Sequence, residues 1–174
     1  MKVNTVLIRG VNDDEVADFA AWTRDMPVLV RFIEFMPYRD NGWTPEKVVP
    51  GLEIAGRLAR LYPQVEWFDR EETDGVASIV RIPGHKGALG FINPMTNKFC
   101  SDCDRVRLTA DGRLRLCLFS EEGMDLRTLL RGGFTDRELG DAISDSVFFQ
   151  KPASQPEPSG RLETVKRRMA EVGG

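Results

Sequence analysis

The three cysteines of the chain lie close together in the run FCSDCDRVRLTADGRLRLCLF, at Cys100, Cys103 and Cys117. Three thiols cannot pair fully into disulfides, and they are one ligand short of a closed tetrahedral zinc site. The spacing C-x2-C-x13-C suits three thiolates on a metal whose fourth position stays open. A [4Fe–4S] cluster and a zinc ion fit this pattern about equally, and three reduced cysteines without a metal are the remaining interpretation.

Arginines are interleaved with apolar residues through the same run, at Arg105, Arg107 and Arg115. Planar guanidinium groups match the oxygens of phosphates, so this pattern favours a phosphate-bearing ligand beside the thiols. A solvated arginine face is the alternative interpretation.

The residues TADGR in the middle of the run predict a β-hairpin. A three-residue loop over 110–112, with Gly112 in the left-handed region, is a common hairpin connection. This loop gives a ribbon with an apolar face and an opposite face that carries arginines and Cys117. The cross-strand pairs on the apolar face are Leu108 with Leu114 and Val106 with Leu116. Those on the other face are Arg107 with Arg115 and Arg105 with Cys117. A two-residue loop would set leucines opposite arginines and is disfavoured.

A strand–helix–strand unit precedes these residues. Val3–Ile8 and Val28–Phe35 are apolar runs typical of strands buried in a parallel sheet. Asn12 and Glu15 resemble a capping box for the helix between them. A second amphipathic helix is predicted from Leu52, Ala55, Leu58, Ala59 and Tyr62.

Shorter elements follow after Glu66. Strands are predicted over Val76–Ile82 and Ala88–Ile92, and a helix over Met124–Arg131 that stops at two glycines. Thr135 with Glu138 predicts the capping box of one more helix.

These elements predict three parts: residues 1–63, residues 64–150, and an extended tail over residues 151–174. Two parallel strands and two helices cannot close an α/β core. We therefore expect the first part to be the end of a larger barrel or sheet, whose beginning lies in a longer protein or in another chain.

Composition narrows the class of protein. The chain has 174 residues, 41% of them apolar and 29% charged, with a formal net charge of −3. This predicts a soluble globular protein without affinity for nucleic acid or an anionic membrane. The chain shows neither a signal peptide nor a membrane span, which favours the cytoplasm.

The segment GFINPMTNKFCSDCDRVRLTADGRLRLCLF closely resembles the C-terminal part of the GTP 3',8-cyclase family. These radical S-adenosylmethionine (SAM) enzymes catalyse the first step of molybdenum cofactor biosynthesis. KVNTVLIRGVND and RFIEFM look like late barrel strands of the family, and the terminal Gly173-Gly174 resembles its double glycine.

The resemblance implies a fold: the final βαβ portion of an incomplete (β/α)6 radical-SAM barrel, then a small α+β domain with antiparallel strands. It also implies an enzyme, a lyase that converts GTP to 3',8-cyclo-7,8-dihydro-GTP. Family members cleave SAM at a cluster held by an N-terminal C-x3-C-x2-C motif. A second, auxiliary [4Fe–4S] cluster, held by three cysteines, contacts the guanine through its open iron.

Carried over by position, the resemblance assigns roles to residues of this chain. Cys100, Cys103 and Cys117 match the ligands of the auxiliary cluster. The positions that match GTP contacts are Lys2, Arg105, Val106 and Arg107, with Arg31 as a further candidate for phosphate. Met36 matches a SAM contact, and Gly173-Gly174 matches a tail that enters the active site. His85, in a polar turn, is expected at the surface.

The chain departs from the family in one respect, because C-x3-C-x2-C does not occur in it and three cysteines cannot hold two clusters. We expect the chain to be inactive without an N-terminal radical-SAM half, which would belong to the same protein or to a separate chain. A homodimer is a possible assembly. The competing interpretation is a non-catalytic three-cysteine metal module, with zinc or iron–sulfur, that binds a nucleotide.

Overall fold

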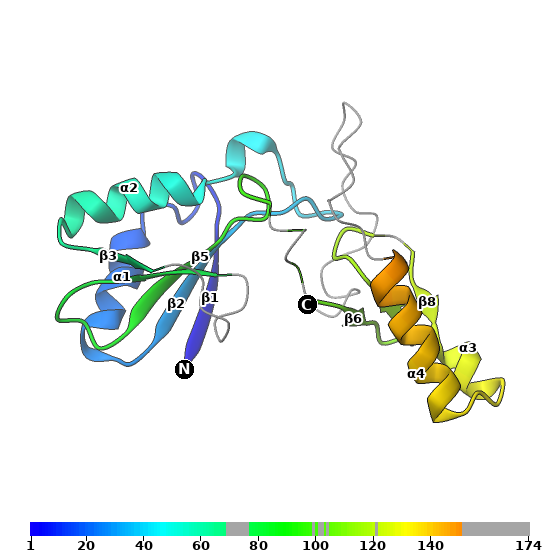
Figure 1. Cartoon of the computed structure of the whole chain (residues 1–174). Helices are drawn as coiled ribbons and strands as arrows, with labels where there is room; N and C mark the ends of the chain where they lie inside the picture. The colour runs from blue at the N-terminus through cyan, green and yellow to red at the C-terminus, as the bar shows by residue number, and fades with distance from the viewer. Residues whose placement is uncertain (69–76, 99, 101–102, 104, 121, 151–174) are drawn as a thin grey trace. The chain divides into compact units, whose positions relative to one another are not determined.

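The computed structural model describes residues 1–68, 77–98, 100, 103, 105–120 and 122–150 (Figure 1). The chain divides into two compact units. The first comprises Met1–Met36 and Trp43–Lys98, and the second comprises Pro37–Gly42 and Phe99–Gly174. None of the helices in the described ranges is long and apolar enough to cross a membrane.

A mixed five-stranded sheet forms the centre of the first unit. Its strands, in spatial order, are β1 (Lys2–Leu7), β2 (Leu29–Glu34), β5 (Ala88–Ile92), β4 (Ser78–Arg81) and β3 (Glu66–Phe68). The pairs β1–β2 and β2–β5 are parallel, whereas β5–β4 and β4–β3 are antiparallel. The predicted strand–helix–strand unit is confirmed, and the strands expected near 76–82 and 88–92 join the same sheet.

Two helices bury one face of this sheet. They are α1 (Val16–Asp25) and α2 (Gly51–Leu61), which contact each other and β2; a short 3-10 turn, η1 (Pro45–Lys47), precedes α2 (Figure 1). The buried core beneath them includes Leu7, Val16, Ala20, Val30, Phe32, Ile54, Leu58 and Phe91. The other face of β1 and β2 therefore carries the alternate residues of each strand.

Two details of the predicted helices are wrong. Glu15, at the N-cap of α1, makes no capping side-chain bond, and Asn12 serves β1 instead: its Oδ1 accepts from Ile8 N at 2.8 Å and its Nδ2 donates to Val6 O at 3.0 Å. Leu52, predicted on the buried stripe of α2, is 85% exposed. Ala59 is exposed as well, whereas the predicted Ala55 and Leu58 are buried, together with Gly51 and Ile54.

The second unit contains a three-stranded antiparallel sheet and two helices. Its strands, in order, are β6 (Arg107–Leu108), β7 (Arg113–Arg115) and β8 (Met124–Asp125). The helices are α3 (Leu126–Arg131) and α4 (Asp136–Asp145), which continues into a π-helical turn, η4 (Ser146–Gln150). The capping box of Thr135 and Glu138 is confirmed. The helix predicted from Met124 begins two residues later, because Met124 and Asp125 pair with β7.

The two compact units do not coincide with the predicted parts 1–63 and 64–150, and the division into those functional parts stays a prediction. Because β5 pairs with β2, the described residues up to Lys98 belong to the first unit, and Pro37–Gly42 belong to the second. The predicted tail over 151–174 lies outside the described residues.

Candidate functional site

The hairpin of β6 and β7 has the predicted register. Arg107 pairs with Arg115 and Leu108 with Leu114. Thr109 N donates to Arg113 O at 2.9 Å, and Gly112 N donates to Thr109 O at 2.9 Å, which closes a three-residue loop. Gly112 has a φ of +83°, and a Cβ there would lie 2.8 Å from the Cβ of Arg127, so both backbone and packing require glycine.

The ladder is shorter than predicted. Strand β6 begins at Arg107 and β7 ends at Arg115. The expected pairs Val106 with Leu116 and Arg105 with Cys117 therefore lie beyond the strands, and they stay predictions.

Burial does not follow the predicted division into an apolar back and an arginine front. On the apolar side Leu114 is 6% exposed, but Leu108 is 61% exposed. On the arginine side Arg115 is only 2% exposed, whereas Arg105 is exposed and Arg107 half-buried. The hairpin thus buries one arginine and exposes one leucine, a difference that strand alternation alone does not predict.

The buried Arg115 and the nearby Arg113 have very different surroundings. The guanidinium of Arg113 lies 3.6 Å from Asp111 and 3.7 Å from Asp125. The guanidinium of Arg115 has no hydrogen-bond partner for Nε, Nη1 or Nη2 in the described part of the chain. A charge in that position ordinarily has an acceptor.

All three cysteines are free thiols and half-buried. Cys103 N donates to Cys100 O at 3.3 Å, so the first two cysteines lie on one turn. Within the described residues, no group of three or more His, Cys, Asp or Glu side chains is arranged to hold a metal ion. The free thiols match the donor chemistry of an iron–sulfur or zinc site, but the structure does not bring the three together.

Lys2 and Arg31 lie on the face of the first sheet opposite α1 and α2. Their strands are adjacent, with Lys2 paired to Leu29 and Asn4 to Arg31. Arg31 Nε donates to Asn4 Oδ1 at 2.8 Å. The sheet thus brings both predicted nucleotide contacts to one face, which also carries the apolar Val6, Leu29 and Ile33.

The stem of Arg31 packs over Gly90 on this face, since a Cβ on Gly90 would lie 3.1 Å from its Cγ. The remaining predicted contacts lie elsewhere in the chain. Met36 is half-buried just after β2, Val106 is 42% exposed before β6, and Gly173-Gly174 lie outside the described residues.

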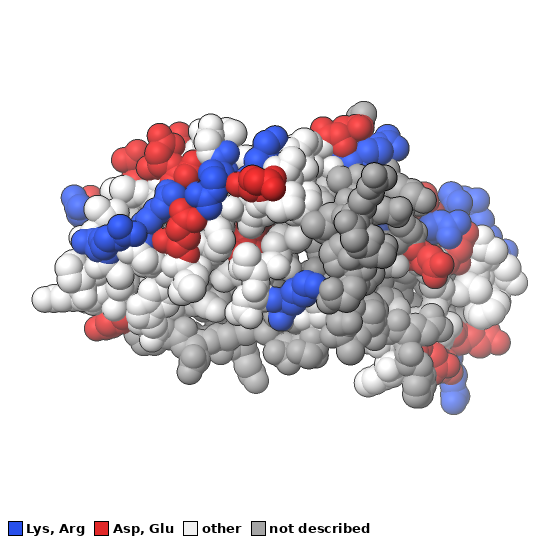
Figure 2. Space-filling model, turned by 90° about the horizontal axis from the view of Figure 1, so that it is seen from above, with Lys and Arg blue, Asp and Glu red and all other residues white. Residues whose placement is uncertain are grey.

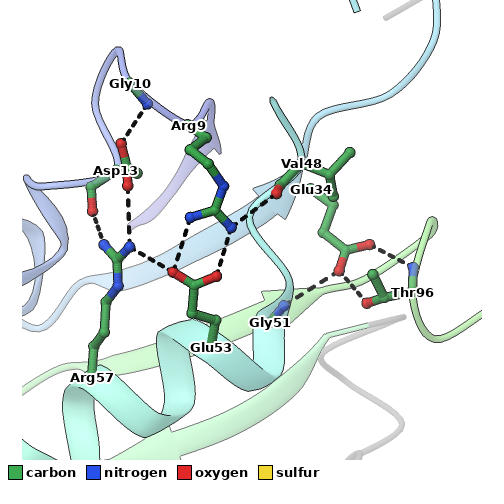
Figure 3. A network of polar contacts seen from close by, with 9 residues as sticks. All are labelled: Arg9, Gly10, Asp13, Glu34, Val48, Gly51, Glu53, Arg57 and Thr96. Atoms are coloured by element: carbon green, nitrogen blue, oxygen red, sulfur yellow. Dashed lines mark hydrogen bonds and ion pairs between the residues drawn. The ribbon is translucent and has the colours of Figure 1, made fainter. Parts of the chain in front are cut away.

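Sequence reasoning missed a buried carboxylate at the end of β2. Glu34 is 2% exposed and accepts from Gly51 N at 3.3 Å, Met95 N at 2.8 Å and Thr96 N at 3.0 Å, and also from the Thr96 hydroxyl (Figure 3). It joins β2, the start of α2 and the loop after β5. These bonds assign Glu34 a structural role, and no local pattern signalled partners so distant in sequence.

A second network links the turn after β1 to α2 (Figure 3). Arg9 donates to both oxygens of Glu53, and Arg57 donates to Glu53 and Asp13. The Gly10 N–H and the Arg57 guanidinium lower the pKa of Asp13, and the guanidinium groups of Arg9 and Arg57 lower the pKa of Glu53. The network holds its carboxylates charged and is positioned to stabilise the fold.

His85 also has partners within the first unit. Its Nδ1 lies 2.8 Å from Thr23 Oγ1, and its ring stands edge-on to Tyr62 at 5.4 Å. Burial, followed by the charge of Arg24, lowers the pKa of His85. These contacts tie the end of α1 to the turn between β4 and β5, where His85 is half-buried.

Charge is mixed over the face of the first unit that carries α2. Figure 2 shows basic and acidic side chains interspersed there, at the left of the view. This face offers no continuous basic patch of the kind that nucleic-acid binding uses.

Comparison with known proteins gives consistent matches. The family model described as Molybdenum Cofactor Synthesis C matches residues 28–155. The mitochondrial GTP 3',8-cyclase of Arabidopsis thaliana is 40% identical over 177 residues, covering 100% of this chain and 44% of the relative. The GTP 3',8-cyclase of Moorella thermoacetica is 42% identical over 174 residues, covering 100% of this chain and 53% of the relative.

A further match is molybdenum cofactor biosynthesis protein 1 of Homo sapiens, 42% identical over 151 residues, covering 87% of this chain and 24% of the relative. The chain spans about half the length of the GTP 3',8-cyclases that it matches.

Proposed function

Because the chain belongs to the molybdenum cofactor synthesis C family, we propose that it forms the C-terminal portion of a GTP 3',8-cyclase. The observation that carries the proposal is about 40% identity along the whole chain to proteins named for that activity. The complete enzyme would convert GTP to 3',8-cyclo-7,8-dihydro-GTP, the first step of molybdenum cofactor biosynthesis, in the cytoplasm.

In this proposal the chain contributes the auxiliary [4Fe–4S] cluster and contacts to GTP. Cys100, Cys103 and Cys117 hold the cluster, which supplies an open iron for the substrate. Three free thiols, two of them on one turn, supply the donor chemistry. The other half of the relatives' length would carry the radical-SAM cluster.

The nucleotide contacts are proposed at two places. Arg105, Val106 and Arg107 approach GTP from the hairpin, where guanidinium groups match phosphate oxygens. Lys2 and Arg31 do so from the face of β1 and β2 opposite α1 and α2, which is the face that the inside of a barrel would present.

SAM and the tail complete the proposed site. Met36 follows the carboxyl end of β2, the end at which parallel-strand barrels build their sites, and would contact SAM. Gly173-Gly174 would enter the site as the C-terminal tail.

The decisive experiment is anaerobic reconstitution of the chain with iron and sulfide, followed by metal analysis and electron paramagnetic resonance (EPR). We expect about four irons per chain, and a loss of this uptake in Cys117→Ser. Stoichiometric zinc with no uptake of iron would overturn the iron–sulfur assignment and leave the metal module as the better interpretation.

A further inference from the structure

The functional residues proposed above do not explain the buried guanidinium of Arg115. It is 2% exposed, and its three nitrogens have no acceptor in the described part of the chain. A guanidinium is charged at any physiological pH, and a buried charge without an acceptor is strongly unfavourable. The position therefore requires an anion that the described residues do not supply.

The stem of Arg115 is held firmly in place. It lies at the end of β7, opposite Arg107, with Gly123 against it. A Cβ on Gly123 would come within 3.0 Å of Arg115 Cγ and 2.8 Å of Leu114 O. The side chain therefore cannot simply swing outward through the position of Gly123.

The carboxylates beside the hairpin are engaged by another arginine. Asp111 and Asp125 lie 3.6 Å and 3.7 Å from the guanidinium of Arg113, which also donates to Gly123 O at 3.4 Å. Arg113 and Arg115 thus differ: Arg113 is half-buried and lies near two acidic side chains, whereas Arg115 is buried and has no acceptor in the described part of the chain.

The nearest anionic chemistry along the chain is sulfur. Cys117 is a half-buried free thiol two residues after Arg115, a separation of at most about 7 Å between Cα atoms. A cluster on thiolates carries negative charge, and its sulfurs accept hydrogen bonds from the protein. Three free thiols and one orphaned guanidinium agree chemically with such a group, although the described residues show no assembled three-ligand arrangement.

We propose that Arg115 is the buried counter-charge of the iron–sulfur cluster and donates hydrogen bonds to its sulfur atoms. The inference rests on the proposed function, because it requires the cluster, and it adds a positioning residue beyond the three thiols. Donors and positive charge beside a cluster stabilise its reduced form. Arg115 therefore sets the potential of the cluster, while Arg105 and Arg107 remain available to the nucleotide.

The test compares the reconstituted 174-residue chain with Arg115→Gln, Arg115→Lys and the matched control Arg113→Gln. The readouts are iron and sulfide content and a redox titration followed by EPR. We expect Arg115→Gln to reduce the equilibrium constant for one-electron reduction at least tenfold, a shift of about 59 mV toward negative potential. Arg115→Lys, which keeps the charge but loses the planar donors, should shift less, and Arg113→Gln should match the wild type.

Each outcome decides the inference. It is supported if Arg115→Gln folds by circular dichroism but holds less than a tenth of the iron found in Arg113→Gln. It is overturned if Arg115→Gln keeps the wild-type potential and iron content. If its affinity for GTP nevertheless falls, a phosphate group of GTP is the acceptor of Arg115, and the inference is overturned as well. Should Arg115→Gln fail to fold, the potential of Arg115→Lys decides: a negative shift supports the inference, and no shift overturns it. A wild-type chain that takes up no iron overturns the proposed function as well, so the two failures are distinguishable.

Discussion

Three arginines of the hairpin differ in what surrounds them, and this allows separate tests of each. Arg107 is half-buried on the strand, Arg105 is exposed just before it, and Arg113 lies near two acidic side chains at the turn. Only the first two are proposed to contact GTP.

Replacing Arg105 or Arg107 by Ala should weaken binding of GTP about tenfold or more. A hydrogen bond to a charged group contributes about 1.5–3 kcal/mol, and about 1.4 kcal/mol corresponds to a factor of ten. Calorimetric titration of the reconstituted protein with GTP measures the effect. Arg113→Ala is the control and should change the affinity little, because Arg113 faces Asp111 and Asp125. Equal, small losses in all three variants would mean that the arginines form a solvated face.

Replacing Glu34 by Gln should destabilise the first unit by about 3 kcal/mol, since an amide cannot accept all the bonds that the carboxylate accepts and buried donors would lose their partner. Urea unfolding measures the change. Glu66→Gln on the exposed start of β3 is the control, with an expected change within about 0.5 kcal/mol. A loss for Glu34→Gln no larger than that of the control would show that the network contributes little.

The contrast between Gly112 and Glu34 shows what a sequence reveals at this scale. The turn around Gly112 could be predicted because its signal is local: a glycine at the left-handed position and matching pairs on either side. The role of Glu34 could not, because its partners Gly51, Met95 and Thr96 come from remote segments. The burial of Arg115 was missed for a different reason: strand alternation does not show that Gly123, eight residues later, packs against its stem.

At the scale of the elements, ion pairs of Arg9 and Arg57 with Asp13 and Glu53 link α2 to the turn after β1. The acidic members of the joint, Asp13 and Glu53, have lowered pKa values through Gly10 N–H and Arg9 respectively, with Arg57 acting on both. A lowered pKa in the folded state adds stability above the ordinary pKa of the carboxyl, and this stability is lost as the pH falls through the lowered value.

The free energy of unfolding should therefore decrease as the pH falls below about 4, and Glu53→Gln should make this dependence shallower. Chemical unfolding at a series of pH values measures both effects. Asp14→Asn is a matched control, because it removes an exposed neighbouring carboxyl without removing a contact of the network. If Glu53→Gln and Asp14→Asn gave the same pH profile as the wild type, the joint would have no measurable electrostatic role.

Strands and helices could be predicted where their hydrophobic patterns are strong, but the order of the strands in the sheet could not. The apolar runs at β1 and β2 predicted a parallel pair, which the structure confirms. The position of β5 between β2 and β4 could not be read from the same runs, because strand order depends on long-range packing. The predicted boundary at residue 63 rests on local patterns alone, and it stays a prediction.

At the scale of the whole molecule, the chain matches about half of each cyclase. Its three cysteines suffice for one cluster, so we expect the isolated chain not to form 5'-deoxyadenosine from SAM under reducing conditions. Chromatography of the reaction products measures this. A protein carrying the C-x3-C-x2-C motif of the family serves as the positive control, and 5'-deoxyadenosine formed by the pure chain alone would contradict the division of roles.

The strand order has a consequence for how the chain is made. The antiparallel strands β4 and β5 are neighbours in sequence and can associate early. Pairing of β5 with β2 is slower, because a long segment of chain separates these two strands. On the ribosome, the edge of β2 that receives β5 is left open until Ile92 has been synthesised. A nascent chain halted between Glu34 and Ile92 would expose the unpaired hydrogen-bonding edge of β2, and such an edge is a site at which chains associate wrongly.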